Sequence, residues 1–226
     1  MITPLLKGSL LSTMTDYSVQ LENLVKYFGR RIVFSEINFL FSSGGIYGIS
    51  GPNGSGKSTL VKIISNIISP TRGKVIHKSD NQNITQENLH NHIGFVSPYL
   101  FLYDEFTAEE NLVHFSNIRG INFEKERSDF LLNKLNLFDR KDDLVRGYSS
   151  GMKQKLKFLF ALLHRPQLII LDEPTSNLDN EGKEKVYELI REEAKSNLVI
   201  IASNEDSDLQ LCKETINIEN YKRNKK

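Results

Sequence analysis

The sequence has little of what marks several common protein classes. A single cysteine, Cys212, excludes an internal disulfide framework and a cysteine-based zinc site, and it suits a reducing compartment. Lys and Arg total 29 against 28 Asp and Glu, so the overall charge predicts no nucleic-acid partner. No apolar run approaches the roughly 18 residues that span a membrane. Of the histidines only His90 and His92 lie close together, which makes a weak case for a metal site.

The two ends of the chain predict little structure. The first 13 residues contain leucines but are broken by Pro4, Lys7 and Gly8, so no signal peptide is predicted. Organised pattern begins just after Met14, which is a candidate for the natural start. The basic tail at 221–226 is expected to be a solvated end, with contact to anionic lipid as the alternative.

A glycine-rich segment in the first quarter of the chain carries the main signal. Two glycines four residues apart precede Lys and Ser, in the order Gly51, Pro52, Asn53, Gly54, Ser55, Gly56, Lys57, Ser58 and Thr59. A short apolar strand comes before this segment, and apolar residues at helical spacing follow it until Pro70. Strand, glycine-rich turn and helix are together the context that a phosphate-binding loop requires.

The chemistry of this loop follows from its geometry. Glycines allow successive backbone N–H groups to point into one concavity, and the helix that begins there adds the positive end of its dipole. Lys57 is expected to reach the β and γ phosphates of a nucleotide, and the Ser58 hydroxyl to ligate Mg2+. The sequence therefore predicts a nucleotide site.

The rest of the chain alternates strands and helices around a helical middle third. We expect an edge strand at 19–25, a second strand at 32–41 and a hairpin centred on Gly73. A helical insertion is expected at about 97–165, with a Thr107–Glu110 capping box near its start. The predicted fold is α/β, with a mixed or parallel sheet core, an antiparallel β edge and this helical subdomain.

An acidic pair ends a second buried strand. Residues 168–171 are all apolar, and Asp172 and Glu173 follow at the carboxyl end, where open α/β sheets bind ligands. Asp172 would hold hydrated Mg2+, and Glu173 would polarise the attacking water. The alternative is that both are solvated loop residues.

These motifs together resemble the ATP-binding cassette (ABC) family, from about residue 19 to 218. The segment Tyr148 to Gln154 is similar to the signature of that family, and the D-loop pattern occurs at 176–179, ending in Asp179. The resemblance implies a phosphate-loop ATPase domain over 19–226, after an N-terminal extension at 1–18. It also implies an aromatic ring that stacks on adenine, a position occupied here by Phe28.

The signature segment also has a physical meaning of its own. Ser149 can cap a helix that begins near Gly151, so that a hydroxyl and free N–H groups face outward as an anion site. The resemblance implies that two cassettes pair head to tail, each signature closing on the ATP of its partner. The signature residues are Ser149, Ser150, Gly151 and Met152.

Two positions depart from the family pattern. Pro98 stands where the family usually has a Gln that ligates Mg2+, and Asn204 stands where it usually has a His that contacts the γ-phosphate. Losing one such contact typically costs ~2–4 kcal/mol of transition-state stabilisation. We therefore predict ATP hydrolysis that persists but is slow, with Asn204 still able to donate a hydrogen bond.

The resemblance also suggests what the ATPase drives. It implies a separate membrane permease, a peripheral position on the cytoplasmic face of the cell membrane, and a permease contact at 99–103. A local core is the alternative for that aromatic segment. The sequence of residues 95–112 is similar to that of exporter-type cassettes, including the haem exporters of cytochrome c maturation. Alternatives to a transport homodimer are an iron–sulfur assembly cassette and a weakly hydrolysing partner in a heterodimer.

Overall fold

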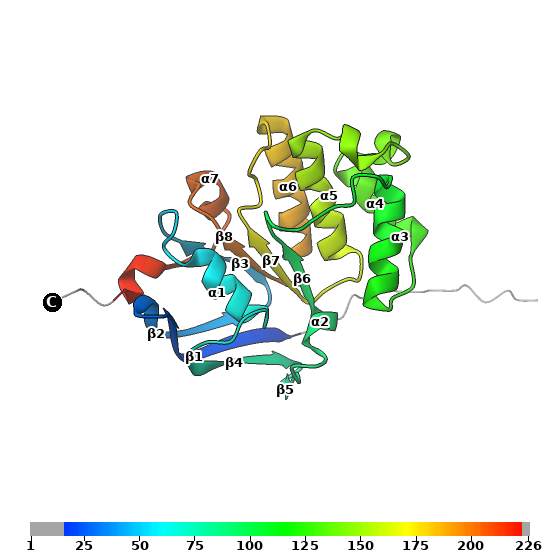
Figure 1. Cartoon of the computed structure of the whole chain (residues 1–226). Helices are drawn as coiled ribbons and strands as arrows, with labels where there is room; N and C mark the ends of the chain where they lie inside the picture. The colour runs from blue at the N-terminus through cyan, green and yellow to red at the C-terminus, as the bar shows by residue number, and fades with distance from the viewer. Residues whose placement is uncertain (1–15, 223–226) are drawn as a thin grey trace, which may run out of the picture.

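The computed structural model describes residues 16–222 (Figure 1). Predictions about the natural start and about residues 223–226 of the basic tail lie outside the described residues. The strands are β1 (Tyr17–Phe28), β2 (Arg31–Ser42), β3 (Gly45–Ser50), β4 (Arg72–Ser79), β5 (Gln82–Asn83), β6 (Ile93–Val96), β7 (Leu168–Asp172), β8 (Leu198–Ala202) and β9 (Glu214–Asn217). The α-helices are α1 (Lys57–Ile64), α2 (Leu89–His92), α3 (Ala108–Arg119), α4 (Lys125–Lys134), α5 (Ser150–Leu162), α6 (Asn180–Glu193) and α7 (Asp206–Leu209).

A five-stranded parallel sheet forms the centre of the molecule, with strand order β6-β7-β8-β3-β9. Its central strands β7 and β8 are almost entirely apolar and fully buried because both faces are covered (Figure 1). Along β7 the side chains alternate between two cores. Leu168 and Ile170 pack toward α1 and the antiparallel sheet, while Ile169 and Leu171 pack toward α5 and α6. The predicted α/β fold is therefore confirmed.

The antiparallel strands form a separate four-stranded sheet, with order β2-β1-β4-β5. The prediction of an edge strand at 19–25 is wrong, because β1 pairs with β2 on one side and with β4 on the other. Its fully buried residues Val19, Leu21 and Leu24 cover the face of α1 that the parallel sheet leaves open. Helix α1 thus lies between the two sheets (Figure 1).

The prediction of a hairpin centred on Gly73 is also wrong. Gly73 lies inside β4, and the tight turn comes later, at Asp80 and Asn81 between β4 and β5. Both turn residues have positive φ, 49° and 63°. Gly73 is needed for another reason: a Cβ at this position would lie 2.4 Å from the carbonyl oxygen of Asn23 on β1.

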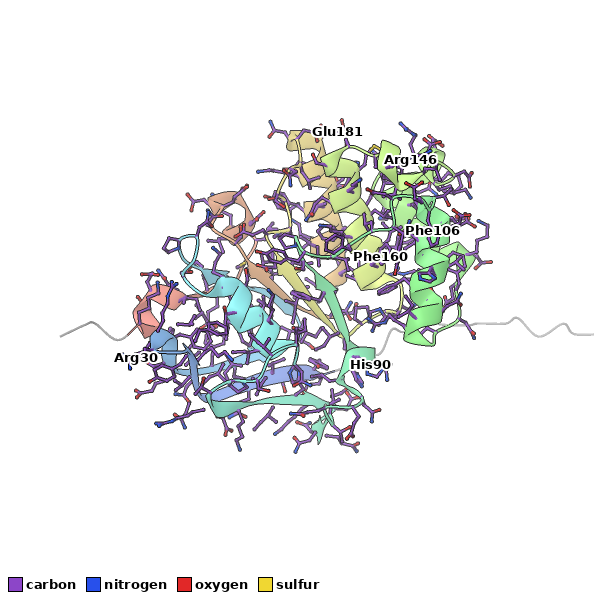
Figure 2. The ribbon with its side chains drawn as sticks, in the orientation of Figure 1. Arg30, His90, Phe106, Arg146, Phe160 and Glu181 are labelled. Carbon is purple, nitrogen blue, oxygen red and sulfur yellow. The ribbon has the colours of Figure 1, made fainter. Side chains whose placement is uncertain are left out.

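Helices dominate residues 97–165, where α5 packs against β6 of the parallel sheet and α3 and α4 pack against α5. The predicted capping box is confirmed at the start of α3. Glu110 N donates to Thr107 Oγ1 (3.1 Å), and Thr107 N donates to the Glu110 carboxylate (2.8 Å). Phe160 of α5, which is labelled in Figure 2, packs against Phe115 of α3, with ring centroids 4.7 Å apart.

Candidate nucleotide site

The glycine-rich segment folds as a loop between β3 and α1. Gly56 stands immediately before α1 with φ 117°, and a Cβ there would lie 2.5 Å from Val33 Cγ1. Any larger residue would therefore be strained and would collide with β2. The helix begins at Lys57, so its first backbone N–H groups face the loop and provide an anion-binding end.

Lys57 connects this loop to the acidic end of β7. Its side chain is 5% exposed, and its Nζ donates to the carbonyl oxygen of Gly51 (2.8 Å). The same Nζ lies 3.4 Å from Glu173 Oε1. Glu173 has a φ of 51°, a left-handed conformation that is uncommon for a residue other than glycine. The ammonium group therefore already contacts the carboxylate that the sequence singled out.

Ser58 and Asp172 form the second contact between α1 and β7. Ser58 Oγ donates to Asp172 Oδ1 at 3.0 Å, and Asp172 is fully buried. Burial raises the pKa of the Asp172 carboxyl; the hydrogen bond from Ser58 lowers it in part, and the charge of Glu173 raises it again. A buried carboxylate in this setting would be stabilised by a cation.

The residues at this contact fit Mg2+. Asp172 Oδ2 is buried and has no hydrogen-bond partner within residues 16–222. A carboxylate and a hydroxyl are hard oxygen donors of the kind that Mg2+ prefers, and Mg2+ usually takes only one or two protein ligands beside waters and phosphates. Ser58 and Asp172 are thus suited to hold it.

Lys57, Ser58 and Glu173 line a pocket of about 470 Å³. Phe28, 55% exposed at the end of β1, lies on its wall, with the Lys26 ammonium 4.9 Å from its ring centroid. The wall includes most of the predicted nucleotide-binding residues, namely Phe28, Asn53, Gly54, Ser55, Gly56, Lys57, Ser58 and Thr59, together with Glu173. Gly51, Pro52, Asp172 and Asn204 are not part of the wall.

Sequence reasoning missed three residues of this wall: Arg31, Val33 and Tyr99. Arg31 Nη2 donates to the carbonyl oxygen of Gly54 (3.4 Å), which places a second cation beside the phosphate-binding loop. Its position in the sequence, just after the turn that follows Phe28, could have indicated that Arg31 lies near the nucleotide. Tyr99 follows Pro98, which also lies on the wall, and Lys62 Nζ lies 4.8 Å from the Tyr99 ring centroid.

The signature segment lies away from this pocket. Ser149 caps α5, as predicted, because its Oγ accepts from Met152 N at 3.2 Å, and its side chain is exposed. Gly151 lies against the D-loop, where a Cβ would be 3.1 Å from the carbonyl oxygen of Asn177. Asp179 caps α6 through Gly182 N (2.8 Å), a role that the sequence reading did not assign to it. Signature and D-loop are therefore neighbours within one chain.

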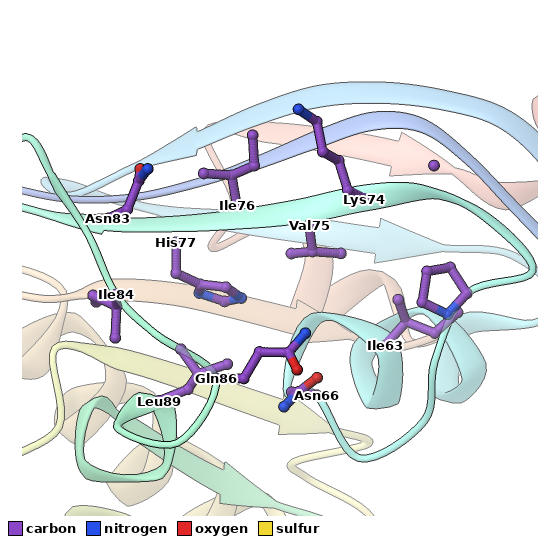
Figure 3. A pocket seen from close by; sticks show the side chains of 12 residues that line it. Ile63, Asn66, Lys74, Val75, Ile76, His77, Asn83, Ile84, Gln86 and Leu89 are labelled. Atoms are coloured by element: carbon purple, nitrogen blue, oxygen red, sulfur yellow. The ribbon is translucent and has the colours of Figure 1, made fainter.

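A second pocket, of about 430 Å³, lies between β4 and the C-terminal end of α1 (Figure 3). It contains none of the predicted site residues. His77 and Val75 point from β4 into the space near Leu89 (Figure 3). Tyr17 OH lies 2.9 Å from His77 Nδ1, and burial lowers the pKa of His77 to about 4. His77 is thus neutral in the folded protein at neutral pH, and Lys74, a cationic residue of this wall, is paired with Glu22 at 3.0 Å.

Comparison with known proteins agrees with this geometry. The family model described as ABC transporter matches residues 34–176. The chain belongs to the ABC transporter family. It is 32% identical over 186 residues to a Nod factor export ATP-binding protein of Sinorhizobium fredii, an alignment that covers 81% of this chain and 54% of that protein. It is 31% identical over 185 residues to a lantibiotic transport ATP-binding protein of Streptococcus pyogenes, covering 82% and 79%.

The same family is found among solved structures. An ABC transporter ATP-binding protein from Pyrococcus furiosus matches with a TM-score of 0.77 and 26% identity, over 90% of this chain and 98% of that one. This cassette spans 54% to 60% of the length of five curated relatives that it matches. Within residues 16–222, no helix is both long and apolar enough to cross a membrane.

Proposed function

We propose that this cassette is an ATP-binding and ATP-hydrolysing subunit that pairs around two ATP molecules and powers a membrane permease. The observation that carries the proposal is the meeting of Lys57 and Glu173 at one pocket beside the glycine-rich loop, with Asp172 hydrogen-bonded to Ser58 of the same wall. A nucleotide triphosphate would place its phosphates on the N–H groups of α1 and its adenine on Phe28.

Each side chain then has a separate task. Lys57 exchanges its present partner, Glu173, for the β and γ phosphates, because their charge is greater. Glu173, released from Lys57, is free to polarise the attacking water. Mg2+ held by Ser58 and Asp172 would neutralise charge on the phosphates. Arg31 adds a second cation on the wall of the pocket, beside the glycine-rich loop.

A second copy of the cassette would supply the signature contact to the γ-phosphate that one chain lacks. The capped, exposed end of α5 is an anion-binding site without a lysine, and it does not face the pocket of its own chain. A head-to-tail partner would bring Ser149, Ser150, Gly151 and Met152 over the γ-phosphate, with Asp179 at the same interface. ATP then holds the two cassettes together, and hydrolysis lets them separate.

The permease contact is the aromatic segment after Pro98. Tyr99, Phe101 and Tyr103 are 70%, 91% and 51% exposed, whereas Leu100 and Leu102 pack against the helical core. This alternation anchors the segment. Tyr99 lies against Lys62, and Tyr103 lies against Phe106 and His114, so Phe101 is the ring that would meet the partner. The cassette would then sit as a peripheral subunit on the cytoplasmic face of the membrane.

Export is the direction that the relatives favour. Their names refer to Nod factor export and to lantibiotic and bacitracin transport, which supports a transport role over iron–sulfur cluster assembly.

The experiment that tests the proposal is phosphate release from the purified cassette beside its Glu173→Gln variant. Turnover by the wild type that the substitution abolishes supports the function, and turnover that survives in Glu173→Gln contradicts it.

A further inference from the structure

Asp208 is a buried carboxylate to which the ATPase motifs assign no task. It lies in α7, just after β8, and is 1% exposed. Three hydroxyl groups from three different elements donate to it. Thr175 Oγ1 and Tyr187 OH each lie 2.8 Å from Oδ1, and Ser203 Oγ lies 2.7 Å from Oδ2.

Two of these hydroxyls belong to the loops that carry the catalytic candidates. Thr175 follows Glu173 by two residues, and Ser203 directly precedes Asn204. Thr175 and Ser203 are 1% and 0% exposed. One carboxylate therefore connects the turn after β7 to the turn after β8. Since burying a carboxylate is costly, its use here is best explained by the orientation it gives to these groups.

The Ser203 hydroxyl connects Asp208 to the nucleotide site. Its oxygen accepts from Glu205 N (3.1 Å), which fixes the backbone on both sides of Asn204. Glu173 Oε2 lies 3.4 Å from the same oxygen. A hydroxyl has one proton, and the shorter contact to Asp208 takes it. Asp208 thereby keeps that proton away from the carboxylate that must accept a proton from water.

We propose that Asp208 is a positioning residue for ATP hydrolysis, acting through Ser203 on both Glu173 and Asn204. This inference rests on the proposed function. Asp208→Asn keeps the shape of the side chain but cannot accept on both oxygens. The amide oxygen can still accept from Thr175 and Tyr187, so the NH2 group faces Ser203 and the Ser203 proton is released toward Glu173.

The test compares Asp208→Asn and Ser203→Ala, singly and together, with Cys212→Ala as the matched control. Cys212 Sγ donates to the backbone carbonyl of Asp208, at 3.8 Å, and its side chain packs at the edge of the helical core. We expect each single variant to lower kcat by about tenfold, a fraction of what a well-placed general base typically supplies. The dissociation constant for ATP should stay within about twofold, because the phosphate-binding loop is untouched.

The double variant decides whether the two residues act as one unit. We expect it to lose no more than either single variant, because the effect of Asp208 passes through Ser203. Additive losses, or equal losses of kcat and ATP affinity, would overturn the proposal. So would a Cys212→Ala variant with the same fall in kcat, since that would mark a general packing defect.

Amide hydrogen exchange separates this inference from the proposed function. The Glu205 amide should exchange faster in Asp208→Asn and Ser203→Ala than in wild type, and at the wild-type rate in Cys212→Ala. A wild-type protein that releases no phosphate would contradict the ATPase proposal. If the Glu205 exchange rate is unchanged in both variants, the positioning role is refuted whatever the activity.

Discussion

Ser149 offers a substitution that separates helix capping from anion binding. Aspartate caps a helix about as well as serine, whereas alanine costs about 1 kcal/mol. In the free cassette, Ser149→Asp should therefore leave the free energy of unfolding within about 0.5 kcal/mol of wild type. In the pair, the new carboxylate would face the γ-phosphate of the ATP bound by the partner.

The expected penalty for pairing is large. Two like charges about 4 Å apart repel by about 4 kcal/mol at the effective dielectric constant near a protein surface. At 1.4 kcal/mol per factor of ten, each such contact should weaken the ATP-bound dimer about 10³-fold, and a pair of identical variants has this contact at both ATP molecules. Light scattering with MgATP in a Glu173→Gln background measures this dimer, and urea denaturation measures the stability of the monomer.

Ser149→Asn is the matched control, because asparagine caps the helix without adding charge. We expect it to keep both stability and ATP-driven pairing. If Ser149→Asp pairs as tightly as Ser149→Asn, the end of α5 does not bind phosphate and the head-to-tail arrangement is wrong.

Two further predictions concern His77 and Pro98. The ordinary pKa of histidine is 6.5, and burial lowers the pKa of His77 to about 4. Between these two pH values only the unfolded chain takes up a proton at His77, so the stability of the fold decreases as the pH falls. At about 1.4 kcal/mol per pH unit, His77 lowers the free energy of unfolding by about 2 kcal/mol between pH 6.5 and 5. Urea denaturation of His77→Gln should therefore show a fall in stability over this range that is smaller by about 2 kcal/mol than in wild type. An equal fall in both proteins would refute the assignment. Pro98→Gln places a polar side chain at the pocket and keeps the backbone carbonyl that accepts from Lys157 Nζ (2.8 Å). It should raise kcat for phosphate release by about tenfold. An unchanged or lower kcat would show that Pro98 does not limit the rate.

Local signals were predictable from the sequence. The phosphate-binding loop, the capping box at Thr107 and the cap at Ser149 each depend on residues within a few positions of one another. The buried strands at 93–96 and 168–171 were visible as apolar runs. The acidic pair was predicted at the carboxyl end of a parallel strand, and the fold brings Lys57 to Glu173 at that edge of the sheet.

Contacts distant in sequence were not predictable in the same way. Nothing within 19–25 shows that β4 will pair with its second side, so β1 was mistaken for an edge strand. Gly73 was interpreted as a turn residue, although it serves the close approach of β4 to Asn23. Asp208 carries no local motif, and its importance appears only when Thr175, Tyr187 and Ser203 are brought together by the fold.

The most direct test of the account is ATP hydrolysis and dimer formation by wild type beside Glu173→Gln. Phosphate release measures turnover, and light scattering with MgATP measures pairing. We predict slow turnover by the wild type, none by Glu173→Gln, and a stable ATP-bound dimer only in the variant, because Glu173 acts on water and not on ATP binding. A Glu173→Gln protein that still hydrolyses ATP, or that binds ATP without ever pairing, would contradict the account.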